Sequence, residues 1–114
     1  MDIVKINGFK CRYKYIKNQS SNETLVFLNG IANPLEAWAD YHTAFDSVYN
    51  ILGYDLRGQW HSEVTQPPYT FKQASLDLKA LLDELKINSA HLIGTSFGGE
   101  VAMHFATTHP TYCK

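Results

Sequence analysis

The sequence has few of the features that mark specialised proteins. It has only two cysteines, Cys11 and Cys113, which are too far apart to indicate a disulfide framework, so a reducing compartment is the simpler interpretation. Neither sign of charge dominates, because ten basic residues face eleven acidic ones, and the basic residues are scattered, which argues against a nucleic-acid partner. Residues 1–5 alternate charged and apolar side chains without a long apolar run, so we expect neither a signal peptide nor a membrane span. These absences predict a soluble, cytoplasmic protein.

What remains is the composition of one globular domain, with 45% apolar and 18% charged residues. Residues 3–6 and 9–15 alternate like strands around the Asn-Gly pair at 7–8, which favours a hairpin turn because both residues tolerate positive φ. In the second arm apolar side chains alternate with basic ones, among them Arg12, which predicts one buried and one solvated face. We therefore expect an antiparallel hairpin at one edge of a sheet.

Continuous apolar runs and helical spacings then alternate along the chain. The runs typical of strands buried on both faces are 24–28, 49–54 and 90–93. The segments with helical spacing are 35–45, 71–85 and 98–108. Thr70 is the expected N-cap of the second helix. This order indicates an α/β fold with a doubly wound, mostly parallel sheet, whose ligands bind beyond the carboxyl ends of the strands.

The last of these strands leads into a glycine-rich turn that carries a serine. Residues 94–98 read Gly-Thr-Ser-Phe-Gly, with a strand before them and a helix after them. A serine hydroxyl becomes a nucleophile when it stands exposed on a constrained turn beside N–H groups that can hold an oxyanion. Side chains at Gly94 and Gly98 would collide where the strand and the helix pass close together. The turn lacks the lysine of a P-loop and the glycine spacing of a dinucleotide site, which argues against a phosphate-binding loop. A serine on such a turn, between a strand and a helix, predicts Ser96 as a nucleophile.

Three stretches of the chain resemble the α/β-hydrolase family. They are residues 25–30 with Asn-Gly where the family usually shows His-Gly, the Asp-x-Arg-Gly turn at 54–58, and the nucleophile elbow at 94–99. The resemblance implies that Ser96 is the nucleophile and that the backbone N–H groups of Ile31 and Phe97 form the oxyanion hole. It further implies that residues 1–114 are the N-terminal portion of a single α/β-hydrolase domain, a truncated form of the fold. The acid and the histidine of the triad are then expected beyond Lys114.

Two residues depart from the family's pattern. Asn29 replaces the usual histidine, as in acyltransferase-like members, and Trp60 stands where the family prefers a second glycine before Ser62. We regard Asn29 and Trp60 as candidate pocket residues. For Asp55 and Arg57, a catalytic acid and a substrate clamp are one interpretation, and a mutual ion pair that fixes the turn is the favoured one.

A serine hydrolase also needs a histidine as general base. His104 lies about 12 Å along a helix from Ser96, and three others fall on helices or a strand where structural roles are expected. His61 lies on a loop at the correct edge, but the family's base follows the nucleophile in chain order. The histidine spacing is not that of a metal site, and we expect no cofactor.

These features predict a serine hydrolase that acts on a small-molecule ester, thioester or lactone through an acyl-enzyme on Ser96. An acyltransferase that uses the same serine and a non-catalytic, hydrolase-like binding domain are the alternatives. Because the base is expected elsewhere, we expect residues 1–114 alone to be inactive. A sheet that stops after the nucleophile strand has an open edge, and that edge is expected to favour self-association.

Overall fold

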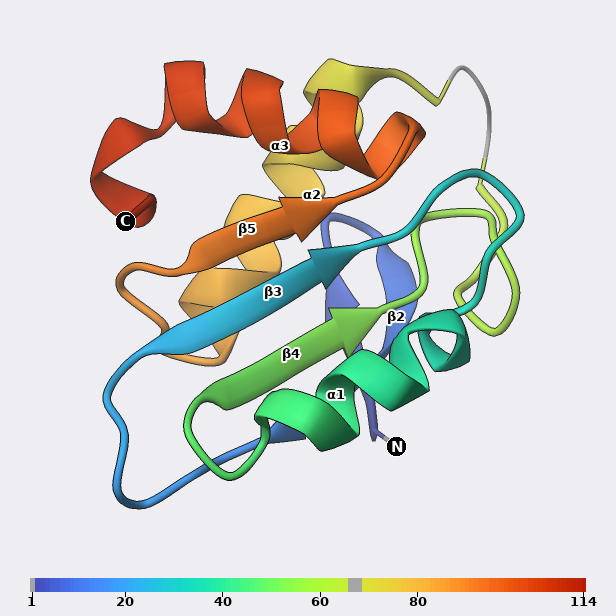
Figure 1. The fold of residues 1–114 in the computed structure, drawn as a ribbon. Coiled ribbons are helices and arrows are strands. Elements are labelled where there is room, and N and C mark those ends of the chain that lie inside the picture. Colours follow the sequence, from blue (N-terminus) through green and yellow to red (C-terminus); the bar gives the residue numbers. More distant parts are fainter. Residues whose placement is uncertain (1, 66–68) are drawn as a thin grey trace.

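The computed structural model describes residues 2–65 and 69–114, which form a five-stranded sheet in the order β1-β2-β4-β3-β5 (Figure 1). The strands are β1 (Asp2–Ile6), β2 (Phe9–Ile16), β3 (Thr24–Leu28), β4 (Asn50–Tyr54) and β5 (His91–Gly94). Strand β2 pairs antiparallel with β1 and β4, whereas β3 pairs parallel with β4 and β5. The sheet is therefore mixed, and the predicted α/β class with an N-terminal hairpin is confirmed.

Helices cover both faces of this sheet. They are η1 (Leu35–Trp38), α1 (Ala39–Phe45), α2 (Phe71–Glu84), α3 (Phe97–Thr108) and η2 (Pro110–Tyr112). In Figure 1, α2 and α3 lie on one face and α1 on the other. The segment predicted as one helix over 35–45 begins as the 3₁₀ turn η1. The predicted N-cap of α2 is confirmed, because the Thr70 hydroxyl accepts a hydrogen bond from the Gln73 amide at 3.0 Å.

The hairpin forms as the Asn-Gly pair predicts, with Asn7 at φ 44° and Gly8 at φ 81°. Its predicted solvated face is wrong at Arg12, whose side chain is only 10% exposed. Arg12 is buried because two carboxylates, Asp55 and Glu36, lie within hydrogen-bond distance of its guanidinium. Burial of a charge is tolerated when such partners replace the lost water.

The central strands are buried on both faces, as their continuous apolar runs predict. Along β3, Val26 and Leu28 belong to the core under α2 and α3, while Leu25 and Phe27 belong to a smaller cluster on the opposite face. The same expectation is wrong for β5, whose residues are half-buried or exposed. Among the described residues, β5 has β3 on one side and, on the other, only the neighbouring bridge between Ala90 and Cys113.

Because β3, β4 and β5 run parallel, their carboxyl ends meet at one edge of the sheet (Figure 1). The loops that begin at Asn29, Asp55 and Thr95 leave from this edge. The sequence therefore brings three separate segments to one place. In the part of the chain that the structure describes, no helix is both long and apolar enough to cross a membrane.

Candidate active site

Ser96 occupies the sharp turn between β5 and α3. Its backbone has φ 52° and ψ −119°, and the residue is exposed at the carboxyl edge of the sheet. The amide of Gly98 closes the turn by donating to the carbonyl of Thr95 at 2.9 Å. A positive φ in a non-glycine residue is strained and collects at functional sites, where the surroundings hold it in place. The turn thus presents the serine hydroxyl to solvent at the N-terminus of a helix.

The glycines that flank the serine are required by close backbone packing. A Cβ at Gly94 would lie 2.5 Å from the carbonyl oxygen of Gly98, and a Cβ at Gly98 would overlap the carbonyl oxygen of Leu28. A Cβ at Gly99 would meet its nearest atom at an ordinary 3.6 Å. The predicted steric role of Gly94 and Gly98 is therefore confirmed.

The loop after β3 passes beside the serine. A Cβ built on Gly30 would lie 3.7 Å from the Cβ of Ser96, which places the next residue, Ile31, close to the elbow. Ile31 and Phe97 both line a cavity of about 340 Å³, whose walls also include Leu56 and Tyr69. Within residues 2–65 and 69–114, the amides of Ile31 and Phe97 donate to no other protein group. In this part of the chain both N–H groups therefore keep their capacity to donate a hydrogen bond.

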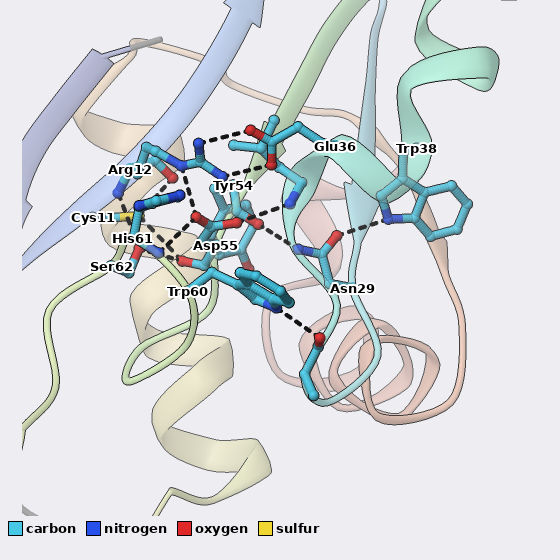
Figure 2. Close-up of polar contacts among 12 residues, drawn as sticks. Cys11, Arg12, Asn29, Glu36, Trp38, Tyr54, Asp55, Trp60, His61 and Ser62 are labelled. Atoms are coloured by element: carbon cyan, nitrogen blue, oxygen red, sulfur yellow. Dashed lines mark hydrogen bonds and ion pairs between the residues drawn. The ribbon is translucent and has the colours of Figure 1, made fainter.

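Asn29 and Trp60, the candidate pocket residues, do not line this cavity. Asn29 is buried, where its amide nitrogen donates to the carbonyl of Tyr54 at 2.9 Å and its oxygen accepts from the Trp38 indole at 2.7 Å (Figure 2). Trp60 is exposed, and its indole nitrogen donates to the carbonyl of Ala32 at 2.6 Å. Both side chains therefore support the loop that passes Ser96.

Asp55 is the centre of the polar network in Figure 2. It is completely buried, and its carboxylate accepts from Arg12 Nε at 2.7 Å, from the Leu35 amide at 2.8 Å and from the His61 amide at 3.2 Å. The guanidinium of Arg12 also donates two hydrogen bonds to the Glu36 carboxylate. These bonds lower the pKa of the Glu36 carboxyl. One buried carboxylate thus joins β2 to the start of η1 and to the 55–65 loop.

The predicted ion pair between Asp55 and Arg57 is wrong. Arg57 pairs instead with Asp77 on α2, at 2.8 and 2.9 Å, and its guanidinium lies over the Phe9 ring at 4.4 Å. Both residues fix the turn, as the structural interpretation holds, but each does so through a distant partner. Neighbours in sequence point apart here because Asp55 faces β2 and Arg57 faces α2.

The histidines that the sequence offers as candidate bases lie in different environments. His42 is buried against the Phe27 ring, and burial lowers its pKa from 6.5 to about 4. His91 lies 3.3 Å from a Glu23 carboxylate oxygen, and His61 has an exposed side chain. Among the described residues, no group of three or more His, Cys, Asp or Glu side chains is arranged to hold a metal ion.

The elbow, the adjacent loop and the sheet order together resemble a known architecture. Residues 23–114 match the family model described as alpha/beta hydrolase fold. The chain belongs to this family. The similarity also covers most of the site, because the matched residues include Ser96, Ile31 and the network around Asp55 except for Arg12.

Individual relatives resemble the chain over part of their length. A 2-hydroxy-6-oxononadienedioate/2-hydroxy-6-oxononatrienedioate hydrolase of Burkholderia vietnamiensis is 32% identical over 111 residues, which cover 91% of this chain and 38% of that protein. The dihydrolipoyllysine-residue acetyltransferase component of the acetoin cleaving system of Cupriavidus necator is 28% identical, over 87% of this chain and 26% of that protein.

Among solved structures, the enol-lactonase of Burkholderia xenovorans superposes with a TM-score of 0.94 and 31% identity, over 99% of this chain and 44% of that one. The chain therefore spans less than half the length of the relatives it matches.

Proposed function

We propose that this chain supplies the nucleophile and the oxyanion hole of a hydrolase that cleaves carboxylic esters, thioesters or lactones. The Ser96 Oγ attacks the carbonyl carbon while a general base accepts its proton. The amides of Ile31 and Phe97 donate to the oxyanion, the alcohol or thiol leaves with a proton, and water then releases the acid from Ser96. The observation that carries this proposal is an exposed serine on a left-handed turn, near two amides that donate to no protein group among residues 2–65 and 69–114.

The electrostatic contribution of these amides is expected to be large. Loss of one oxyanion donor typically costs about 3 kcal/mol of transition-state stabilisation, or about a hundredfold to a thousandfold in kcat. Phe97 N–H lies at the first turn of α3, where the helix dipole also favours negative charge. The Ile31 amide depends instead on the conformation of its loop. The position of this loop therefore decides whether the hole has one donor or two.

The base and the acid of the triad are proposed to come from residues outside 1–114. Four of the five histidines lie elsewhere, because His42 is buried, His91 lies beside Glu23, and His104 and His109 lie along α3 and just after it. The fifth, His61, precedes Ser96 in the chain. In the α/β-hydrolase pattern the acid and the base follow the nucleophile in chain order. The partial coverage of the relatives is in keeping with this proposal.

The cavity next to the proposed oxyanion hole favours an apolar acyl group. Ile31 and Phe97 form part of its wall, and Leu56 and Tyr69 add further apolar surface. The likeness to an enol-lactonase favours a lactone or an ester as substrate. An acyltransferase is the second candidate, because one relative is named as an acetyltransferase component. Product analysis with a competing alcohol acceptor separates the two, since only a transferase forms a new ester in preference to the acid.

The test uses the full-length protein that contains residues 1–114. A fluorophosphonate probe should label the wild type, and Ser96→Ala should abolish both labelling and turnover of a p-nitrophenyl ester. Ser47→Ala is the matched control, since Ser47 is an exposed serine on the turn after α1, and this variant should keep both signals. Labelling that persists in Ser96→Ala would contradict the proposal. Absence of labelling in the wild type would favour a non-catalytic binding domain.

The location of the base is tested separately with residues 1–114 alone. We expect little turnover of the same ester, because the nucleophile then lacks its proton acceptor. Normal turnover by this fragment would place the base within residues 1–114, where His61 on the 55–65 loop would be the first residue to mutate.

A further inference from the structure

Both backbone groups of Ala32 are held by one neighbouring loop. The Ala32 amide donates to the Gln59 side-chain oxygen. The Ala32 carbonyl accepts from the Trp60 indole nitrogen at 2.6 Å, and Figure 2 shows this bond leaving Trp60. Gln59 and Trp60 belong to the loop after β4, whereas Ala32 belongs to the loop after β3. Two consecutive side chains thus fix a residue that lies about 27 positions earlier in the chain.

Ala32 directly follows Ile31, the proposed oxyanion donor. Its amide belongs to the peptide plane between Ile31 and Ala32, so the bond to Gln59 restricts rotation on the carboxyl side of Ile31. Ala32 has a φ of 67°, a conformation that favours glycine and needs external support in other residues. The loop is also closed by the Asn33 amide, which donates to the Gly30 carbonyl at 3.2 Å. The contacts to Gln59 and Trp60 are the long-range part of this support.

Trp60 has a backbone conformation and an exposure that are unfavourable for a tryptophan. Its φ is 48°, which is rare for a bulky residue, and its side chain is 58% exposed. Core packing does not account for a tryptophan in such a place, because most of its surface faces solvent. A glycine would adopt the same backbone without strain. Among the described residues, the hydrogen bond that the tryptophan side chain adds is the one to Ala32.

We propose that Trp60, together with Gln59, is a positioning residue that orients the Ile31 amide toward the oxyanion. The inference rests on the proposed function, since it assigns these side chains a part in the same catalytic step. Trp60 and Gln59 act through Ala32 and do not supply the reacting groups. Removal of Trp60 should therefore lower kcat and leave KM nearly unchanged, because the oxyanion forms only in the transition state. Gln59 also lines the cavity beside Ile31, so its variants are compared by kcat alone.

The main test compares Trp60→Phe with Trp60→Gly in the full-length protein, at a temperature well below the unfolding midpoints. Both variants lose the indole N–H, so kcat should fall about tenfold in each, with KM within about twofold of wild type. Their stabilities should differ, because phenylalanine keeps the positive φ and glycine relieves it. The thermal midpoint should fall in Trp60→Phe and hold or rise in Trp60→Gly. Val64→Ala is the control on the same loop, since Val64 is 73% exposed, and its kcat should not change.

Gln59 provides an independent arm. Gln59→Leu removes the acceptor of the Ala32 amide and should lower kcat, whereas Gln59→Glu keeps a carboxyl oxygen there and should restore most of it. A purely structural role would make kcat follow the thermal midpoint. Wild-type kcat in Trp60→Gly would overturn the proposal.

The outcome of Ser96→Ala separates this inference from the proposed function. If Ser96→Ala is inactive and the Trp60 and Gln59 variants keep wild-type kcat, only the positioning role fails. If Ser96→Ala is as active as wild type, the nucleophile itself is misassigned, and both proposals are overturned.

Discussion

Replacing Asp55 with asparagine should destabilise the protein through the network that joins the site loops. Asp55 is fully buried and lies 2.7 Å from Arg12 Nε, and the Arg12 side chain is 10% exposed. Asparagine keeps an oxygen for the Leu35 amide but loses the charge that faces the guanidinium. The Asp55→Asn variant therefore tests the charge pair while it changes the shape of the side chain very little.

The magnitude follows from what Arg12 retains. Removing one partner of a buried ion pair typically costs about 3 to 5 kcal/mol, because the other charge is left buried and unpaired. Here Arg12 keeps two hydrogen bonds to Glu36, at 2.7 and 2.8 Å, and the Glu36 side chain is 49% exposed. The remaining charge is thus partly compensated. We expect a loss near the lower limit, about 3 kcal/mol in the free energy of unfolding.

Urea unfolding of two double-mutant cycles measures this pair directly. In the cycle of Asp55→Asn with Arg12→Met, the coupling energy should be about 2 kcal/mol. The cycle with Arg57→Met is the matched control, because Arg57 pairs with Asp77, and its coupling to Asp55 should stay below about 0.5 kcal/mol. A loss under about 1 kcal/mol in Asp55→Asn, or a larger coupling to Arg57 than to Arg12, would refute the reasoning.

Two further predictions concern the packing around the sheet. Gly98→Ala should cost at least about 2 kcal/mol of stability in urea unfolding, because its Cβ would overlap the Leu28 carbonyl, whereas Gly99→Ala should be tolerated. Comparable losses in the two variants would contradict the packing argument. Burial lowers the pKa of His42 from 6.5 to about 4, so the unfolded chain binds the proton more readily. The free energy of unfolding should be greatest above pH 6.5 and fall by about 2 to 3 kcal/mol toward pH 4.5, and the His42→Leu variant should not show this fall. Identical pH profiles of unfolding in wild type and His42→Leu would exclude a role of His42 in the pH dependence.

Local patterns predicted the elements that depend on neighbours in sequence. The positive φ values at Asn7 and Gly8, the cap at Thr70 and the close contact of Gly94 with Gly98 all depend on residues within a few positions. Such features are encoded by residue type alone, because turns and caps need specific φ values or specific hydrogen-bonding side chains. The elbow was therefore the most predictable part of the candidate site.

The sequence-based predictions that were wrong, or missed a contact, concern residues far apart in the chain. Alternation along the hairpin placed Arg12 with the solvated residues, since the pattern carries no information about Asp55, 43 positions later. The Asp55–Arg57 pair was predicted from proximity in sequence, although adjacent turn residues point to different elements. The contact of Trp60 with Ala32 was missed for the same reason. The one available signal was a tryptophan at a position where the family prefers glycine.

The hairpin has a consequence for comparisons within the family. Residues 23–114 match the family model, and β1 and β2 lie outside that range. Strand β2 nevertheless supplies the guanidinium that neutralises Asp55, and its backbone exchanges hydrogen bonds with Ser62 and Glu63 of the 55–65 loop. A version of the protein trimmed to the shared region would keep Ser96 on its turn but leave Asp55, at the base of the loop that carries Trp60, without its buried counter-ion. The first two strands are therefore part of the scaffold that holds the candidate site and not a dispensable extension.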